Sequence, residues 1–204
     1  PISKAPNNRH HPTRFFLITF TISATINLAY LFLCKYPGVA PQDTVSQMAE
    51  AMNLSDYSNW TPYWHTVTIE LFYDIGYFLF HDVNAALCTY TAVQAVFASL
   101  CYAYLLTTLY QLRLPTIWLG FTTFLYCFLP YNIIFSITIG KDILFGLGLL
   151  LMITGLARIL LDIGKVSWLN YFAFFIGSVG FSLWRTNGFF IYVIFSLICG
   201  LCFY

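Results

Sequence analysis

The chain has 204 residues, of which 59% are hydrophobic, 20% aromatic and only 8% charged, and its mean hydropathy is +0.74. Soluble proteins carry about 25% charged residues, so this composition excludes a soluble globular domain and indicates an integral membrane protein. The formal net charge of +1 removes the electrostatic basis for a nucleic-acid partner, which requires clustered lysines and arginines.

A basic segment followed by a membrane span begins the chain. Residues 1–14 carry Lys4, Arg9 and Arg14 without an acidic residue, which by the positive-inside tendency predicts a cytoplasmic N-terminus. Residues 15–34 form an uncharged run of about the 20 residues needed to cross a bilayer. No small-residue cleavage site follows, so the run is predicted to be a span rather than a signal peptide.

Residues 36–82 form the polar region of the chain and contain six of its eight acidic residues. The sequence Thr-Val-Ser-Gln at 44–47 has the spacing of a capping box and predicts the start of a short helix. Further along, apolar residues recur at helical spacing, while His65, Glu70 and Asp74 lie off that apolar stripe. We expect this second amphipathic helix to lie along the membrane surface, within an extracytoplasmic loop after the first span.

Apolar runs separated by short polar segments fill the rest of the chain. They predict spans at 84–112, 116–138, 143–161, 168–184 and from the 185–188 segment to the end. Pro130 is expected to kink the second of these spans. The predicted fold is therefore all-α: a polytopic transmembrane bundle of about six spans, with amphipathic helices beside the membrane in the first loop. Because the chain starts at Pro1 and ends inside an apolar run, we expect it to be the N-terminal part of a larger domain.

Cations are distributed unequally between the two ends of these predicted spans. With a cytoplasmic N-terminus, Arg113, Arg158 and Lys165 also lie inside, as the positive-inside tendency requires. Lys141 and Arg185 then lie outside, on the same side as the acidic loop. Because charged groups at membrane depth are candidates for function, these two cations indicate an extracytoplasmic site.

The candidate site combines carboxylates and cations from segments far apart in the sequence. Its residues are Asp43, His65, Lys141, Asp142, Arg185 and Asn187. A carboxylate can deprotonate an acceptor hydroxyl, while Arg and Lys can neutralise a phosphate leaving group. The six cysteines lie in or beside apolar runs and predict neither a disulfide framework nor a metal site.

Each of these residues also has a purely structural interpretation. Asp43 could extend a helix cap, Asp142 could be the N-cap of its helix, and His65 could be satisfied by a structural partner. Lys141 and Arg185 could instead extend towards lipid headgroups. Burial and contacts in the folded chain bear on which interpretation applies.

Four short motifs resemble those of the GT-C superfamily of polytopic membrane glycosyltransferases. In chain order they are YPGVAPQDT at 36–44, W-T-P-Y-W-H-T at 60–66, Lys-Asp at 141–142 and R-T-N-G at 185–188. Their layout, with an early span, an acidic loop and later spans that follow the motifs, is similar to that of uncharacterised bacterial members. The resemblance covers essentially the whole chain.

The resemblance implies an inverting glycosyltransferase that uses a polyprenyl-phosphate-linked sugar donor at the extracytoplasmic face. Asp43 matches the loop acid that acts as catalytic base, and Lys141 and Arg185 match cations that contact the donor phosphate. Pro62 and His65 match the His/Pro element of the family. The implied partners are membrane lipid, the lipid-linked donor and a glycan, lipid or protein acceptor.

Three residues, His65, Asp142 and Asn187, would then orient the donor or the acceptor. No metal ligands are assigned, and a divalent metal is left open as a cofactor. Two other classes also stay open. A transporter or flippase for a lipid or anion predicts matching broken helices in inverted repeats, whereas a membrane O-acyltransferase predicts a buried intramembrane histidine. His65 is expected in a surface loop instead.

Overall fold

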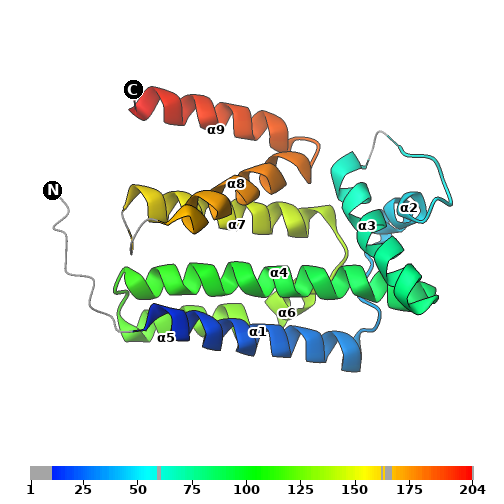
Figure 1. Cartoon of the computed structure of the whole chain (residues 1–204), viewed down its shortest axis with the longest axis horizontal. Coiled ribbons are helices and arrows are strands. Elements are labelled where there is room, and N and C mark those ends of the chain that lie inside the picture. The colour runs from blue at the N-terminus through cyan, green and yellow to red at the C-terminus, as the bar shows by residue number, and fades with distance from the viewer. Residues whose placement is uncertain (1–10, 59–60, 162, 164–166, 204) are drawn as a thin grey trace.

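The computed structural model describes residues 11–58, 61–161, 163 and 167–203 (Figure 1). Its helices are α1 (Pro12–Cys34), α2 (Gln42–Ala51), α3 (Tyr63–Phe80), α4 (Val83–Gln111), α5 (Thr116–Phe128), α6 (Pro130–Ser136), α7 (Lys141–Leu160), α8 (Trp168–Leu183) and α9 (Gly188–Phe203). Val39 and Thr138 form an isolated parallel bridge, and the described ranges contain no strand. The predicted all-α fold is confirmed.

Three helices, α1, α4 and α7, are long and apolar enough to cross a membrane. The pair α5 and α6 passes the same test when taken together but is bent by 48°. α8 and α9 have 16 residues each, a length of about 24 Å at 1.5 Å per residue, which is less than the roughly 30 Å hydrocarbon core. The chain is therefore a membrane protein with three such helices in its described part, or four if the bent pair is one span. The predicted number of six is not confirmed.

The break between α5 and α6 lies at Leu129 and Pro130, where the sequence predicted a kink. Proline lacks an N–H donor and its ring clashes with the preceding turn, so α5 ends at Phe128 and α6 begins at Pro130. Asn132 Nδ2 donates to the Leu125 carbonyl oxygen over 2.7 Å. This bond satisfies one backbone acceptor beside the break, as an apolar environment requires.

The long helices run side by side, with α4 at the centre of the bundle (Figure 1). α1, α5 and α6 pack against one side of α4 and α7 against the other, and α8 then covers α7 and α9 covers α8. α2 and α3 lie at one end, where α3 runs across the bundle rather than along it (Figure 1). The start of α7 and the turn between α8 and α9 reach the same end.

Close backbone approach and buried polar contacts hold the long helices together. A Cβ atom on Gly148 of α7 would lie 2.7 Å from the backbone nitrogen of Phe181 in α8, so only glycine fits there. Between α1 and α4, Asn27 Nδ2 donates to Ser99 Oγ over 3.0 Å inside the bundle. Small residues and interhelical hydrogen bonds are the usual means by which membrane helices associate.

α3 presents its apolar stripe to the outside of the molecule. Its buried face consists of His65, Thr66, Ile69 and Gly76. The large apolar side chains on its exposed surface include Trp64, Leu71, Ile75, Phe78 and Leu79. A helix that crosses the end of the bundle with an exposed apolar surface has the character expected of an interfacial helix.

α2 is present as predicted, but the predicted capping box is wrong. The N-cap residue is Pro41, and no side chain caps the helix. Thr44 lies within the first turn, and its Oγ1 donates to the Ile139 carbonyl oxygen over 2.8 Å. Gln47 Nε2 donates to Thr66 Oγ1 over 3.0 Å. The two side chains that suggested a cap therefore attach α2 to other segments of the chain.

Candidate functional site

All six predicted site residues lie at one end of the bundle, which we call the polar end. It is formed by α2, α3, the start of α7 and the turn between α8 and α9 (Figure 1). The residues that it carries are Asp43, His65, Lys141, Asp142, Arg185 and Asn187. Segments far apart in the sequence thus meet at the same end, as the charge pattern suggested.

Asp43 lies in the first turn of α2 with an exposed side chain. Two bonds hold this turn beside the residues that lead into α7: Thr44 Oγ1 donates to the Ile139 oxygen over 2.8 Å, and Ile139 N donates to the Val39 oxygen over 2.8 Å. They bring the chain around Asp43 close to the chain around Lys141. Within the described ranges, no ion pair joins Asp43 to a cation.

Arg185 and Asp142 form an ion pair at the polar end, with Nη1 and Oδ1 separated by 3.4 Å. The guanidinium carbon of Arg185 also lies 5.4 Å from the centre of the Phe145 ring. The two paired side chains are 46% and 60% exposed, so the guanidinium keeps donors available for a ligand. The N-cap of α7 is Gly140, so the interpretation of Asp142 as an N-cap is wrong. Asn187 is exposed in the same turn as Arg185.

His65 is fully buried, and a chain of hydrogen bonds fixes its tautomer. Gln94 Nε2 donates to the backbone oxygens of Ser136 and Thr138 over 3.0 and 2.8 Å. Gln94 Oε1 therefore faces Tyr90, whose hydroxyl donates to it over 2.9 Å. That hydroxyl can then only accept from His65 Nε2, 3.1 Å away. His65 thus carries a proton on Nε2, and its buried Nδ1 has no partner among the described residues.

The expected surface position of His65 is wrong, because the side chain is 0% exposed in the first turn of α3. Burial, with a smaller contribution from the Lys141 ammonium, lowers the pKa of His65 to about 3. A histidine with this pKa is neutral near pH 7 and too weak a base for general-base catalysis. Its part in the site is to hold α3 against α4 near Lys141.

Acidification is expected to destabilise the protein through His65. The unfolded histidine binds a proton below about pH 6.5, whereas the native one stays neutral down to about pH 3. Stability is therefore fully present above the unfolded pKa and is lost as the pH falls towards 3. Between pH 7 and pH 5 this amounts to about 2 kcal/mol, measurable by denaturant unfolding in detergent. The matched variant His65→Gln should lose this part of the pH dependence; an identical slope for both proteins would contradict the assignment.

Three residues of the polar end were missed by reasoning from the sequence. Tyr90 and Gln94 belong to the apolar helix α4, whose overall hydropathy concealed them. The sequence did contain a signal for these two residues. A tyrosine and a glutamine four residues apart lie on one face of the predicted span, and polar groups buried within a span need hydrogen-bond partners. Glu50 is 3% exposed and accepts bonds from Thr61 Oγ1 over 2.6 Å and from Ser58 N over 3.3 Å. These bonds fold the loop after α2 onto that helix.

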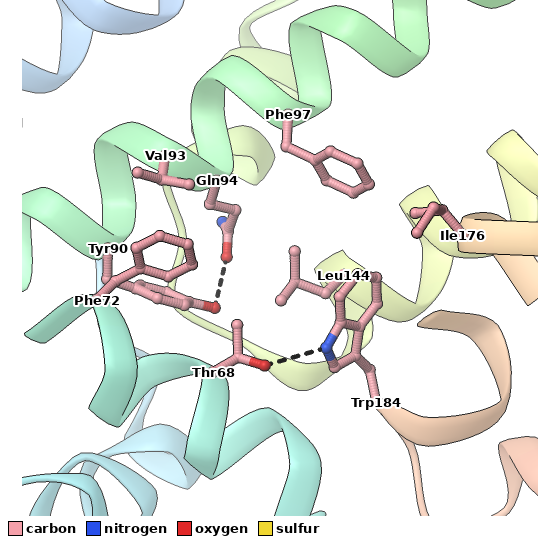
Figure 2. Close-up of a pocket in the computed structure, with 9 residues that line it drawn as sticks. All are labelled: Thr68, Phe72, Tyr90, Val93, Gln94, Phe97, Leu144, Ile176 and Trp184. Atoms are coloured by element: carbon pink, nitrogen blue, oxygen red, sulfur yellow. Dashed lines mark hydrogen bonds between the residues drawn. The ribbon is translucent and has the colours of Figure 1, made fainter. Parts of the chain in front are cut away.

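An apolar cavity of about 210 Å³ lies beside the polar end (Figure 2). It lies between α3, α4, α7 and α8 and is open on one side, and its lining residues are Thr68, Phe72, Tyr90, Val93, Gln94, Phe97, Leu144, Ile176 and Trp184. Trp184 Nε1 donates to Thr68 Oγ1 over 3.3 Å and so joins α8 to α3 at the cavity (Figure 2). Trp184 immediately precedes Arg185 and Leu144 follows Asp142 by two residues, so the segments that carry the ion pair also line the cavity.

The polar end therefore offers an exposed carboxylate, two cations and an adjoining apolar cavity. In the described ranges, no group of three or more His, Cys, Asp or Glu side chains is placed to hold a metal ion. Fold and site together define an all-α membrane protein whose charged end lies beside an apolar cavity. No protein-family model, curated protein or solved structure matches the chain.

Proposed function

We propose that the chain belongs to an inverting membrane glycosyltransferase of GT-C type that uses a polyprenyl-phosphate-linked sugar donor. The supporting observation is that Asp43, Lys141 and Arg185 gather at the polar end beside an apolar cavity (Figure 1). Such a donor has an anionic phosphate and an apolar tail. The cations suit the phosphate, and the cavity suits the first part of the tail.

In the proposed reaction, Asp43 takes the proton of an acceptor hydroxyl while the oxygen attacks the anomeric carbon of the donor sugar. The bond between that carbon and the phosphate oxygen breaks, and the lipid phosphate leaves with the electron pair. Lys141 and Arg185 stabilise the negative charge that develops on the leaving group. One displacement inverts the anomeric configuration, and the acceptor is a hydroxyl of a glycan, lipid or protein.

The other predicted residues take supporting roles in this proposal. Asp142 orients the Arg185 guanidinium through the ion pair, and the exposed Asn187 amide contacts the sugar. His65 positions α3 through Tyr90 and does not touch substrate, because it is fully buried. A requirement for a divalent ion would be detected as loss of turnover in EDTA.

The proposed orientation has the polar end outside the cell and the N-terminus in the cytoplasm. Arg113 follows α4 and Arg158 lies in the last turn of α7, both at the opposite end of the bundle from Lys141 and Arg185 (Figure 1). Arg113 and Arg158 then lie inside, as the positive-inside tendency favours, whereas Lys141 and Arg185 lie outside against it, and Lys165 is not among the described residues.

Asp43→Asn is expected to reduce turnover by about 10²-fold to 10⁴-fold, the usual contribution of a general base. The assay uses the full-length protein in proteoliposomes with a panel of labelled polyprenyl-phosphate sugars. Asp74→Asn is the matched control, because Asp74 is an exposed acid on the neighbouring helix α3 and should leave turnover unchanged. A folded Asp43→Asn protein with wild-type turnover would remove Asp43 from the mechanism.

One observation favours a second function, that of a transporter or flippase for a lipid or anion. The α5 and α6 pair is broken and bent by 48°, and broken helices line the binding sites of many transporters. This alternative predicts movement of labelled lipid or anion across the proteoliposome membrane without a glycosylated product. His65 is buried, as the O-acyltransferase alternative predicted, but its pKa of about 3 makes it too weak a base to activate an acyl acceptor, so this alternative has less support.

A further inference from the structure

A second polar cluster lies at the end of the bundle opposite the polar end, where α4 and α7 end and α8 begins (Figure 1). It contains Arg158 of α7, Asn170 of α8, and Tyr104 and Thr108 of α4. The cluster is remote from Asp43, so its role is independent of the proposed glycosyltransferase reaction.

Among the described residues, the groups that contact the Arg158 guanidinium are neutral. Its Nε donates to Asn170 Oδ1 over 3.1 Å, and its Nη1 donates to Thr108 Oγ1 over 3.1 Å. The guanidinium carbon lies 5.0 Å from the centre of the Tyr104 ring, whose hydroxyl donates to Asn170 Oδ1 over 3.1 Å. Across the described residues, no carboxylate forms an ion pair with Arg158. Its positive charge is therefore not neutralised by the part of the chain that the structure describes.

The Asn170 side chain adds a buried donor that has no acceptor. Because Arg158 Nε can only donate, the atom that faces it must be the oxygen of the amide, which fixes the position of Nδ2. Asn170 is 3% exposed, and its Nδ2 is buried without a hydrogen-bond partner in the described ranges. Buried polar groups are nearly always paired, so an unpaired donor beside an unneutralised cation indicates a missing acceptor.

The start of α8 supplies further donors at the same place. Asn170 lies in the first turn of this helix, and the N-cap residue Ser167 makes no side-chain capping bond. The first N–H groups of a helix have no partner within it and carry the positive end of its dipole. The guanidinium, Asn170 Nδ2 and the helix N-terminus therefore all offer hydrogens, while the one acceptor of the amide, Asn170 Oδ1, already accepts from Arg158 and Tyr104.

We propose that Arg158, Asn170 and the first turn of α8 form a binding site for a phosphate group. Phosphate has the negative charge that Arg158 needs and enough oxygens to accept from the free guanidinium hydrogens, from Asn170 Nδ2 and from the helix N-terminus. A neutral acceptor would satisfy Asn170 Nδ2 but would leave the charge of Arg158 unneutralised.

The surroundings suit a lipid headgroup as the source of this phosphate. Leu160 and Leu161, which follow Arg158, are about half exposed, and Trp168 at the start of α8 is 71% exposed. Exposed apolar and tryptophan side chains at the end of a membrane bundle contact the acyl chains and the interface. Basic pockets between membrane helices bind anionic headgroups in this way. Free phosphate offers the same chemistry, and the experiment distinguishes the two.

The test compares anion binding by wild type and variants of the full-length protein. In one arm, nanodiscs contain phosphatidylcholine with or without phosphatidylglycerol, and native mass spectrometry measures the phosphatidylglycerol retained after extraction. In the other arm, the thermal midpoint in detergent is measured in sodium phosphate and in sodium chloride at equal ionic strength. Arg158→Gln is expected to lower retention about tenfold or more, the effect of losing charge-assisted hydrogen bonds.

Asn170→Asp separates anion binding from a purely structural role. The aspartate keeps an oxygen for Arg158 Nε and places an internal negative charge beside the guanidinium. We expect this variant to lose phosphatidylglycerol retention while its thermal midpoint in phosphatidylcholine alone equals or exceeds that of wild type. Arg14→Gln is the matched control, since it removes an exposed cation of α1 from the same end of the bundle, and it should retain the lipid.

Two outcomes support the proposal, and two would overturn it. Loss of lipid retention in Arg158→Gln and Asn170→Asp assigns the site to a headgroup. A rise of the wild-type midpoint in sodium phosphate that is absent in Arg158→Gln, without selective lipid retention, assigns it to free phosphate. Wild-type behaviour of both variants in both arms would refute a phosphate site. An equal loss of retention in Arg14→Gln would show that net charge alone attracts the lipid.

Discussion

Gly148→Ala is expected to destabilise the protein by about 3 kcal/mol or more, the upper part of the range for overpacked sites. The new Cβ atom would lie 2.7 Å from the backbone nitrogen of Phe181, 3.1 Å from the carbonyl carbon of Gly180 and 3.2 Å from the Gly177 oxygen. These obstacles are backbone atoms of α8, which cannot rotate away as a side chain can. α7 and α8 must separate along their contact, and a large fall in the thermal unfolding midpoint in detergent should follow.

The matched control for this substitution is Gly146→Ala, in the same helix. A Cβ atom on Gly146 would meet nothing within 4 Å, so the substitution adds no clash. Alanine also favours the helix by up to about 1 kcal/mol over glycine in soluble hosts. The midpoint of this variant should equal that of wild type or exceed it. If both variants lost the same stability, close packing at Gly148 would not be the cause.

Gln94→Leu is expected to lower the free energy of unfolding by about 3 kcal/mol or more. Its amide satisfies the backbone oxygens of Ser136 and Thr138 and accepts from the Tyr90 hydroxyl. Leucine removes the side-chain donor of the two backbone oxygens, at about 1 to 3 kcal/mol each, and leaves the Tyr90 hydroxyl only its contact with His65. The segment between α6 and α7 should detach from α4, and hydrogen exchange of residues 136–139 should accelerate with the loss of stability.

The control for this prediction is Gln111→Leu, at the other end of the same helix. The side-chain oxygen of Gln111 is buried and has no hydrogen-bond partner among the described residues. Removing an unpaired buried polar group is neutral or stabilising. Gln111→Leu should therefore keep or raise the unfolding midpoint; equal losses in the two glutamine variants would show that general polarity of α4, rather than the Gln94 bonds, maintains stability.

The positions of most helices could be predicted because the hydropathy of a segment depends only on its own residues. α1, α4 and α7 carry uninterrupted apolar sequence, and Pro130 breaks the next run for a reason contained in its own ring. The positions of α8 and α9 were also predicted, but their lengths of 16 residues leave the expected count of spans unconfirmed. Local sequence gives the position of a helix more reliably than its full extent.

The internal arrangement of the candidate site could not be predicted in the same way. That Lys141 and Arg185 share an end followed from counting spans, but the enclosure of His65 depends on Tyr90 and Gln94 in another helix. The Thr44 side chain likewise matched a capping pattern and instead bonds to a carbonyl 95 positions further along. Such contacts depend on how distant segments pack together, so no local pattern in the sequence predicts them.

The outward apolar stripe of α3 has a consequence for how the polar end meets its ligands. α3 crosses the bundle, and it is bonded to α2 by Gln47 and to the end of α8 by Trp184 (Figure 1). In the proposed orientation this stripe would settle at a fixed depth in one leaflet, and the segments that carry Asp43 and Arg185 would be held at a constant height above the acyl chains. The proposed lipid-linked donor would then reach them by lateral diffusion, in a two-dimensional search.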